Sequence, residues 1–269
     1  MFGQHKITIG GDPEFFLQDH NNCFISPHKF VPGTKHDPTP SSAMPEGFYH
    51  VDGLAVELNI PPASYSLDFL MSFKILIKEM SKLAQAHGAT IVGDDILNFE
   101  QLNVPFESLP GWVRELGCDP DFDAYDDVPN EVVDPNTFRC AGGHFHVGWR
   151  EPEEIDFDHY ELCRQVAMKL DSTVGIYTRS LQLEDERKLL YGKAGAFRPK
   201  PYGIEYRTPG NLVWLGDRTL SVAFRLIMYT MQNFENVPFI PHQRELISCP
   251  SGSGLKALMK AREKVLCLI

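Results

Sequence analysis

Cys140-Ala-Gly-Gly-His-Phe-His-Val-Gly-Trp149 is the stretch from which the fold and the chemistry of this chain are best approached. It places His144 and His146 two residues apart in an apolar segment of strand-forming residues. In a strand, residues i and i+2 point to the same face, so the two imidazoles project side by side. Gly142 and Gly143 remove side-chain bulk just before them, which lets a ligand or another backbone come close. Such a pair suits a metal ion or a polyanion, and two hydrogen-bonded core histidines are the alternative.

The overall composition is that of a folded chain with a sizeable core. The 269 residues are 43% hydrophobic and 23% charged, with a formal net charge of -11 at pH 7. We expect a single domain over residues 1–269, and the negative charge argues against non-specific electrostatic binding of nucleic acid. The sequence has no signal peptide, no apolar run of membrane-spanning length and no CxxC pair among its six cysteines. We therefore expect a cytoplasmic protein with free, mostly buried thiols.

The first acidic segment lies near the N-terminus. Short strands are predicted over residues 6–9 and 14–17, with a turn at Gly10–Pro13 between them. Glu14 sits among apolar residues, where a carboxylate is costly unless it is paired or binds a cation. A surface-facing glutamate in an alternating strand is the alternative.

The second acidic segment is a predicted strand over Tyr49–Ile60, closed by Pro61 and Pro62. Alternation places Glu57 and Asn59 on a face otherwise lined by small residues, while apolar side chains occupy the other face. An acid and an amide in this arrangement indicate a polar site on a sheet, or else a half-solvated strand.

Helices are predicted where apolar residues recur at helical spacing, over about residues 67–87, 156–183, 217–234 and 254–266. We expect Ser66 to cap the first helix and Gly88 to end it. A short strand is expected at Ala89–Val92, and residues 23–47 and 93–135 are interpreted as mainly loops.

An Asp-x-Asp-x-Asp pattern begins at Asp119 in the acidic stretch from Gly117 to Pro135. This spacing occurs in calcium-binding loops, but the glycine at the sixth position is missing and Asn130 stands where the bidentate glutamate belongs. A solvated loop or an amine-attracting rim is the favoured interpretation.

A basic, glycine-containing stretch runs from Arg187 to Asn211. Arginine and lysine side chains together with backbone N–H groups suit phosphate, although the spacing is not that of a P-loop. A surface basic loop is the alternative. Within this stretch a strand is predicted over Gly203–Thr208, on which Glu205 and Arg207 share a face.

Three predicted strands thus each present a pair of polar residues on one face, and a fourth contributes one acid. The residues are Glu57 and Asn59, His144 and His146, Glu205 and Arg207, and the single Glu14. Carboxylates with one or two imidazoles suit Mg²⁺ or Mn²⁺. The basic stretch would supply the charge neutralisation that phosphoryl transfer requires.

Four motifs carry a resemblance to a known family: Gly11-Asp-Pro-Glu-Phe15, Val56-Glu-Leu-Asn-Ile-Pro-Pro62, Gly142-Gly-His-Phe-His-Val-Gly148 and Tyr202-Gly-Ile-Glu-Tyr-Arg-Thr-Pro-Gly-Asn211. In this order, over about residues 7–215, the sequence resembles the phage-encoded carboxylate–amine ligases (amidoligases, type 2) of the glutamine synthetase/glutamate–cysteine ligase superfamily. The resemblance implies an α+β fold, in which the concave face of a curved antiparallel sheet holds Mg·ATP and helices pack on the outer face. It also implies an ATP- and Mg²⁺-dependent ligase that joins a carboxylate to an amine through an acyl phosphate.

The resemblance implies roles for ten residues. The implied metal ligands are Glu14, Glu57, Glu205 and His146. The implied catalytic residues, which hold or neutralise the transferred phosphate, are Arg207, Arg198 and His146. The implied cofactor contacts are Arg187, Lys200, His144 and Asn59.

The sequence departs from the family pattern at the first acidic strand. Superfamily members often have Glu-x-Glu there, whereas Phe16 follows Glu14 at that spacing. One or two Mg²⁺ ions, with Mn²⁺ as a substitute, are therefore expected rather than three.

Two other functions account for part of the sequence. A metal-dependent hydrolase or cupin-like enzyme would use His144 and His146 with Zn²⁺ or Fe²⁺, but it leaves the basic stretch without a role. A nucleotide- or metabolite-binding protein without turnover is the third possibility. For the ligase, the resemblance implies a small-molecule or peptide carboxylate and an amine as substrates, no membrane partner and a host-cytoplasmic location. Relatives often form dimers or larger rings, so a homo-oligomer is open.

Overall fold

The computed structural model describes residues 2, 6–115, 121–130, 137–182, 186–189, 191–248 and 253–269. Its strands are β1 (Thr8–Asp19), β2 (Phe24–Ile25), β3 (Thr39–Pro40), β4 (Phe48–Asp52), β5 (Ala55–Ala63), β6 (Ala89–Val92), β7 (Ile96–Asn98), β8 (Phe122–Asp123), β9 (Val128–Pro129), β10 (Phe138–Cys140), β11 (Gly143–Gly148), β12 (Ala196–Lys200) and β13 (Gly203–Tyr206). Its α-helices are α1 (Ser66–Ala86), α2 (Gly111–Arg114), α3 (Phe157–Leu170), α4 (Ile176–Leu181), α5 (Asp217–Gln232), α6 (Gln243–Ser248) and α7 (Ser253–Leu266). A π-helical turn at Asp171–Gly175 joins α3 to α4.

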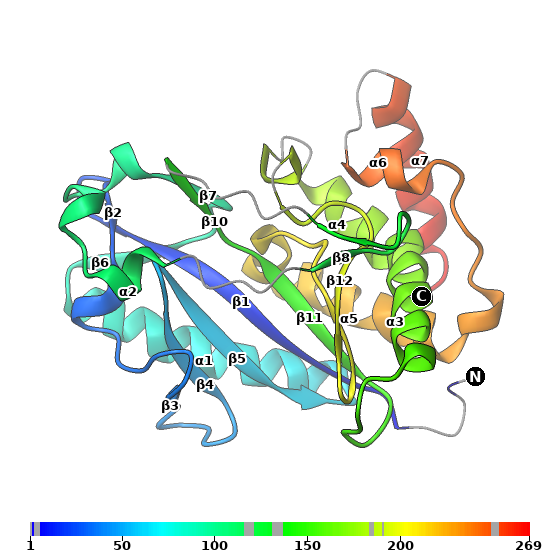
Figure 1. The fold of residues 1–269 in the computed structure, drawn as a ribbon, viewed down its shortest axis with the longest axis horizontal. Helices are drawn as coiled ribbons and strands as arrows, with labels where there is room; N and C mark the ends of the chain where they lie inside the picture. Colours follow the sequence, from blue (N-terminus) through cyan, green and yellow to red (C-terminus); the bar gives the residue numbers. More distant parts are fainter. Residues whose placement is uncertain are drawn as a thin grey trace.

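Among the described residues, eleven strands form one sheet in which neighbours run antiparallel. The order is β3-β4-β5-β1-β11-β13-β12-β8-β9, with β2 and β6 also paired to β1. β7 and β10 form a separate two-stranded sheet. The long strands β1, β5 and β11 cross the middle of the molecule (Figure 1). The antiparallel sheet with packed helices is the architecture predicted from the sequence.

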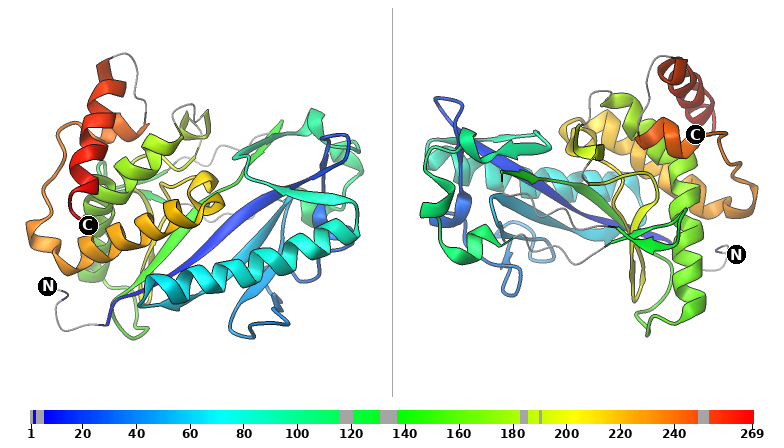
Figure 2. Two further views of the ribbon diagram at one scale, coloured as in Figure 1. Left: turned by 180° about the vertical axis from the view of Figure 1, so that it is seen from behind. Right: turned by 45° about the horizontal axis from the view of Figure 1, so that its top comes forward.

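Helices α1 and α5 lie across one face of this sheet, as the view from behind shows (Figure 2). The apolar side chains of β1 and β11 point into this layer, where the Phe145 ring stacks on Trp214 with centroids 4.8 Å apart. Phe69 of α1 contacts both rings. Because side chains alternate along a strand, the residues next to Phe15 and Phe145 face the opposite side. That opposite face carries the polar residues.

The two glycines before the histidine pair make room for protein side chains. A Cβ atom on Gly143 would lie 2.2 Å from Trp214 Nε1, and one on Gly142 would lie 2.2 Å from His144 Nε2. The predicted close approach is therefore real. Its partners are an indole on one face of the sheet and an imidazole on the other.

The predicted turn at Gly10–Pro13 is wrong. β1 continues through it as one strand, with Pro13 opposite Gly143 of β11 and Gly11 opposite Ile60 of β5. Pairing on both edges holds these residues in extended conformation despite their turn-forming character. A register shift between Ile9 and Gly11 accommodates the irregularity.

The predicted strand over Tyr49–Ile60 is instead a hairpin of β4 and β5. Gly53 supplies the turn with a φ of +58°, a conformation that favours glycine. Beyond the turn the alternation is as predicted, because Val56 and Leu58 are buried while Glu57 is half-buried on the other face. The strand does not close at the two prolines but extends to Ala63.

The four predicted long helices are confirmed, with three local differences. Residue 183, the predicted end of the second helix, lies outside the described residues, and this helix is interrupted by the π-helical turn. Ser66 is not the capping residue of α1. Its hydroxyl is instead 3.1 Å from that of Ser221 on α5. Gly88 follows the end of α1 with a φ of +71°, as expected for a terminating glycine.

The cysteines in the described part of the chain are unpaired: Cys23, Cys140, Cys163 and Cys267. Cys163 is buried as predicted, whereas Cys267 is exposed, and Cys118 and Cys249 lie outside the described residues. None of the described helices is long and apolar enough to cross a bilayer. The single-domain interpretation stays a prediction.

Candidate functional site

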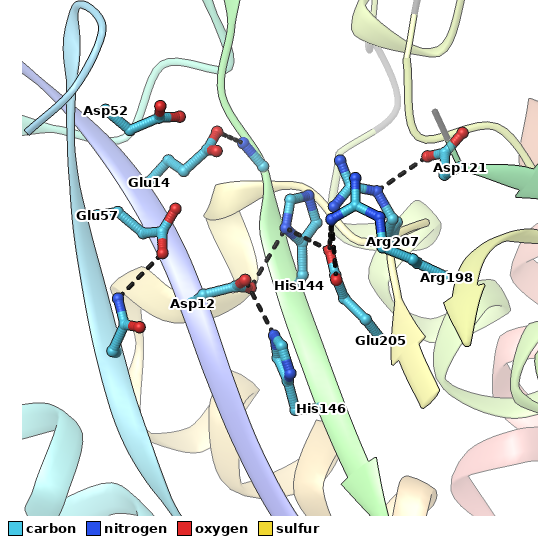
Figure 3. A network of polar contacts seen from close by, with 12 residues as sticks. Asp12, Glu14, Asp52, Glu57, Asp121, His144, His146, Arg198, Glu205 and Arg207 are labelled. Carbon is cyan, nitrogen blue, oxygen red and sulfur yellow. Dashed lines mark hydrogen bonds and ion pairs between the residues drawn. The ribbon is translucent and has the colours of Figure 1, made fainter. Parts of the chain in front are cut away.

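Three cross-strand pairs place the acids and imidazoles of the candidate site side by side. Where β1 pairs with β11, Asp12 lies opposite His144, and where β11 pairs with β13, His146 lies opposite Glu205. On the other edge of β1, Glu14 lies opposite Glu57 of β5. Their side chains gather over one face of the sheet (Figure 3). The register of four strands therefore assembles the site.

The first acidic group consists of Asp12, His144 and Glu205, each of which offers one ligand atom within 4.8 Å of the others. Asp12 Oδ1 is 3.2 Å from His144 Nδ1, which is 3.7 Å from Glu205 Oε1. The other Asp12 oxygen is 2.9 Å from His146 Nε2. Asp12 Oδ1 and His146 Nε2 are both buried, and each lies in one of these ion-pair contacts. Buried lone pairs of this kind suit a cation.

The outer nitrogen of each imidazole contacts a tyrosine hydroxyl. His144 Nε2 is 3.0 Å from the Tyr191 hydroxyl, and His146 Nδ1 contacts the Tyr202 hydroxyl. Metal-binding histidines are commonly oriented by a partner on the second ring nitrogen. The two tyrosines leave His144 Nδ1 and His146 Nε2 directed at Asp12.

The second acidic group consists of Glu14, Asp52 and Glu57, whose oxygens also lie within 4.8 Å of one another. Glu14 Oε2 accepts a hydrogen bond from the Gly142 N–H at 2.8 Å. Glu57 Oε1 accepts one from Asn59 Nδ2 at 3.0 Å. The predicted Glu57/Asn59 pair therefore shares a face and an interaction.

Arg139 of β10 balances part of the charge of the second acidic group. Its guanidinium forms a hydrogen bond with Asp52, and its Nη2 is 3.8 Å from Glu14 Oε1. Three carboxylates and one guanidinium would carry a charge of about −2 when all are ionised. One divalent cation would neutralise that charge.

The charges of the first group favour the protonation states that a metal ligand needs. Burial alone would raise the pKa of Asp12, but His146 and His144 beside it hold that pKa well below its usual value. Burial, together with the positive charge of Arg207, lowers the pKa of His144. Asp12 is therefore ionised and His144 neutral near pH 7, as metal binding requires.

The acids of the second group repel one another. Burial raises the pKa of Glu14 to about 7, even though Arg139 opposes the shift. Burial also raises the pKa of Glu57 well above its usual value, and the negative charges of Asp12 and Glu14 add to the effect. Carboxylates in this state are relieved by a cation, so the donor set fits Mg²⁺ or Mn²⁺.

We expect a divalent cation to stabilise the protein more at about pH 8 than at about pH 5.5. The pKa of Glu14 is raised from 4.5 to about 7, so between these values the folded state binds more protons than the unfolded chain. The resulting stability is complete below pH 4.5 and is lost as the pH rises through about 7. A bound cation replaces the lost protons, so its stabilising effect is larger at the higher pH.

Thermal unfolding at both pH values, with MgCl₂ or MnCl₂ against EDTA, checks this expectation. The Glu14→Gln protein should show a smaller difference between the two pH values. Glu107→Gln, at an exposed position, should behave like the wild type. Equal stabilisation by the cation at both pH values would contradict the expectation.

Three cationic side chains converge on Glu205, whose carboxylate is buried. Its Oε2 is 2.8 Å from Lys200 Nζ and 3.2 Å from Arg198 Nη1, and its Oε1 pairs with Arg207. Arg207 is anchored by a second acid, with its Nε 2.9 Å from Asp121 Oδ2. The basic stretch therefore borders the first acidic group and gives an otherwise acidic protein a local positive site.

Arg187 lies apart from this cluster. It is fully buried, donates from Nη2 to the Thr208 carbonyl at 3.1 Å, and has its Nε 3.8 Å from Asp95 Oδ2. The Tyr191 ring connects it to the site, with its centroid 5.5 Å from the Arg187 guanidinium and 5.1 Å from that of Arg207. The proposed contact of Arg187 with a cofactor stays a prediction.

A cavity of about 730 Å³ adjoins Asp12 and His146. Asn59 and Tyr202 also line it, together with the cationic side chain of Arg150. Its volume is in the range of small-molecule and cofactor sites. A ligand in this cavity would contact Asp12 of the first acidic group and also His146.

The structure brings together all of the predicted site residues except Arg187. Glu205 and His144 belong to the first acidic group, and Glu14 and Glu57 belong to the second. His146 belongs to neither group but contacts Asp12. Arg198, Lys200 and Arg207 contact Glu205, and Asn59 contacts Glu57.

Asp12 is the main residue that interpretation of the sequence missed. It was assigned to a turn, although Asp12-Pro13-Glu14 is an acid-x-acid pair on one strand face. The expected second acid was sought at Phe16, whereas it lies two residues before Glu14. The spacing was a usable signal that the supposed turn obscured. Asp52, Arg139, Tyr191 and Tyr202 were also missed, and their spacing contains no comparable signal.

The acidic stretch 117–135 is described only in part, because residues 116–120 and 131–136, Asp119 among them, lie outside the described ranges. Within the described part, Asp121 pairs with Arg207 and accepts a hydrogen bond from Asn130 at 2.8 Å. Asp123 Oδ2 is 2.8 Å from Arg244 Nη2. These carboxylates thus bind cationic and amide side chains of the protein itself.

The sequence matches no protein-family model and no curated protein. The fold is nevertheless similar to solved structures, one of which is GmaS without ligand. That similarity has a TM-score of 0.50 at 13% sequence identity and covers 98% of this chain and 64% of the GmaS chain. This chain therefore spans less than two thirds of that neighbour. GmaS is glutamine synthetase-like, which agrees with the α+β fold class predicted from the sequence.

Proposed function

We propose that this protein is an ATP- and divalent-metal-dependent ligase that joins a carboxylate to an amine through an acyl phosphate. The observation that carries the proposal is how charged groups are arranged over one face of the sheet. The two acidic groups lie side by side and each includes one residue of β1. A cluster of cations contacts Glu205 of the first group, and a cavity of nucleotide size adjoins Asp12 of the same group. A ligase of this type needs all three features, whereas a simple metal hydrolase needs only the acids and imidazoles.

Two metal sites account for the acidic groups. The first would be held by Asp12, His144 and Glu205, and the second by Glu14, Asp52 and Glu57. Cations bound there would neutralise negative charge on the phosphates and on the attacking carboxylate. Ligands on adjacent strands fix both sites to one rigid sheet.

The cavity beside His146 is the proposed nucleotide site. Tyr202 offers an aromatic surface, and Arg150 and Lys6 supply positive charge. A nucleotide here would direct its terminal phosphate toward Asp12 and the first acidic group. His146, whose Nε2 is buried 2.9 Å from Asp12 Oδ2, faces the same place.

The basic side chains are proposed to stabilise the transferred phosphate. Arg207 is 2% exposed and held by Glu205 and Asp121, so it is positioned before the substrate arrives. Arg198 and Lys200 contact the same carboxylate and are half-buried, so they would act on a phosphate that extends from the cavity to the first acidic group. Preorganised cations act most strongly in such a water-poor site.

The structural similarity to GmaS supports the fold on which this proposal depends. GmaS is gamma-glutamylmethylamide synthetase, and its name describes formation of an amide bond. An amide-forming reaction would require a carboxylate substrate, a phosphate donor and an amine, the three components that the proposed sites accommodate. We propose that the carboxylate and the amine are each a small molecule or part of a peptide.

Calorimetric titration of Mg·ATP into the wild type and into Glu57→Gln, with and without EDTA, tests the proposal. Glu57 belongs to the second acidic group, and glutamine keeps its shape while removing its charge. We expect binding that requires the metal and weakens at least about tenfold in the variant. Glu107→Gln, on the surface, is the matched control.

The alternative is a metal-dependent hydrolase, which the Asp12/His144/Glu205 group would also suit. Tightly held, stoichiometric zinc or iron in a folded protein that binds no Mg·ATP would overturn the ligase proposal and favour this alternative. Mg·ATP binding without phosphate release, across a screen of acids and amines, would instead indicate a nucleotide-binding protein without turnover.

A further inference from the structure

His50 is a buried histidine next to the second acidic group to which the site described so far gives no role. It lies on β4 directly opposite Glu57 of β5. Asp52 follows it at i+2, so the two side chains share a face of the strand. Only 4% of His50 is exposed. Strand register therefore places its imidazole beside Glu57, at the edge of the Glu14/Asp52/Glu57 group.

The imidazole of His50 has no hydrogen bond in the described part of the chain. Both Nδ1 and Nε2 are buried, and Nε2 is 3.8 Å from Glu57 Oε1, too far for a hydrogen bond. Leaving a buried polar group without a partner is costly, so its position calls for an explanation. By contrast, the buried His159 has its Nε2 2.8 Å from the Lys200 carbonyl.

We propose that His50 is the fourth protein ligand of the cation held by Glu14, Asp52 and Glu57. This inference rests on the proposed function, because it takes a divalent cation to bind in the second acidic group. A cation among these carboxylates would also accept the lone pair of a neutral imidazole directed at it. Coordination would satisfy the buried nitrogen and would place a nitrogen donor in an otherwise all-oxygen site.

The added nitrogen changes which metal the site selects. Mg²⁺ and Mn²⁺ both bind carboxylate oxygens, but Mn²⁺ accepts an imidazole nitrogen more readily than Mg²⁺ does. The first acidic group already contains His144. With His50, each acidic group has one imidazole, and the two metal sites become similar in donor type. We therefore expect the second site to bind Mn²⁺ in preference to Mg²⁺.

Electron spin-echo spectroscopy of bound Mn²⁺ tests the assignment, since it detects the ¹⁴N nucleus of a coordinated imidazole independently of activity. The measurement is made on His144→Gln/His146→Gln, which lacks both imidazoles beside Asp12, and on the triple variant that adds His50→Leu. We expect a nitrogen coupling in the first variant and its loss in the triple variant. Adding His159→Gln instead of His50→Leu, which removes a hydrogen-bonded histidine elsewhere, should keep the coupling.

Metal titration supplies a second readout. His50→Leu should weaken Mn²⁺ binding to one site at least about tenfold, and Mg²⁺ binding less. If His50→Leu does not fold, His50→Gln replaces it, and the nitrogen signal of the His144→Gln/His146→Gln protein is compared with and without His50. Absence of that signal, or its survival without His50, would overturn the assignment.

The results also separate this inference from the proposed function. Mn·ATP binding by a wild-type protein whose nitrogen signal disappears with His144 and His146 alone would reject His50 as a ligand and leave the ligase proposal intact. A wild-type protein that binds neither Mn²⁺ nor Mn·ATP would reject both.

Discussion

Replacing Asp12 by asparagine is expected to weaken divalent-metal binding by about 100-fold and to reduce ligase turnover by at least about 10³-fold. Asp12 is the only acid of the described site that contacts both imidazoles of the histidine pair, with oxygens 3.2 Å from His144 Nδ1 and 2.9 Å from His146 Nε2. Asparagine keeps the shape of the side chain but removes the charge that these two contacts and the metal depend on.

Metal titration followed by Mg·ATP titration checks this expectation. Asp158→Asn, at an exposed position on α3, is the matched control and should bind like the wild type. The Asp12→Asn protein should also lose the share of metal-dependent stability that comes from the first acidic group, while the share from the second group remains. Metal and nucleotide affinities close to those of the wild type would show that Asp12 is not a ligand.

Replacing Arg207 by alanine is expected to lower the rate of phosphate release by about 10²–10³-fold, a loss of about 3–4 kcal/mol of transition-state stabilisation. The affinity for Mg·ATP should fall much less, by under about tenfold, because Arg207 acts on charge that develops during transfer. Its guanidinium is fixed by two acids, Glu205 and Asp121, so it needs no rearrangement at that moment.

Separate measurement of nucleotide affinity and of phosphate release distinguishes these effects. Arg207→Lys keeps the charge but cannot bridge two carboxylates, so it should restore only part of the rate. Arg218→Ala, an exposed arginine at the start of α5, is the control. Unfolding experiments on Arg207→Ala are needed as well, because the change leaves Glu205 without one of its partners. A loss confined to nucleotide affinity would contradict the assigned role.

The part of the site that could be predicted consists of residue pairs spaced two apart along a strand. His144 with His146 and Glu57 with Asn59 are each two residues apart and share a strand face. Glu205 and Arg207 also contact each other, although β13 ends at Tyr206, short of the predicted strand end at Thr208. The period of a strand is a local property, so it can be read without knowledge of the fold.

What could not be predicted depends on pairing between distant strands. Gly10–Pro13 has the composition of a turn, but β5 and β11 hold it extended, and only then does Asp12 join Glu14 on one face. Arg139 lies on a separate two-stranded sheet and reaches Asp52 across 87 positions of sequence. No periodic pattern reports a contact of that kind. The hairpin turn at Gly53, by contrast, has a local sequence signal, because the dipeptide Asp52-Gly53 is typical of such turns.

Because side chains alternate along β1, the effect of an insertion in this strand depends on whether the number of inserted residues is odd or even. One residue inserted between Ile9 and Asp12 would turn both acids of β1 toward the helices and bring Phe15 among the charged groups. An insertion of two residues would keep the faces but shift Asp12 away from His144. The site therefore depends on the same strand register as the fold, and a change in chain length that preserves the site must fall in a loop that connects the strands.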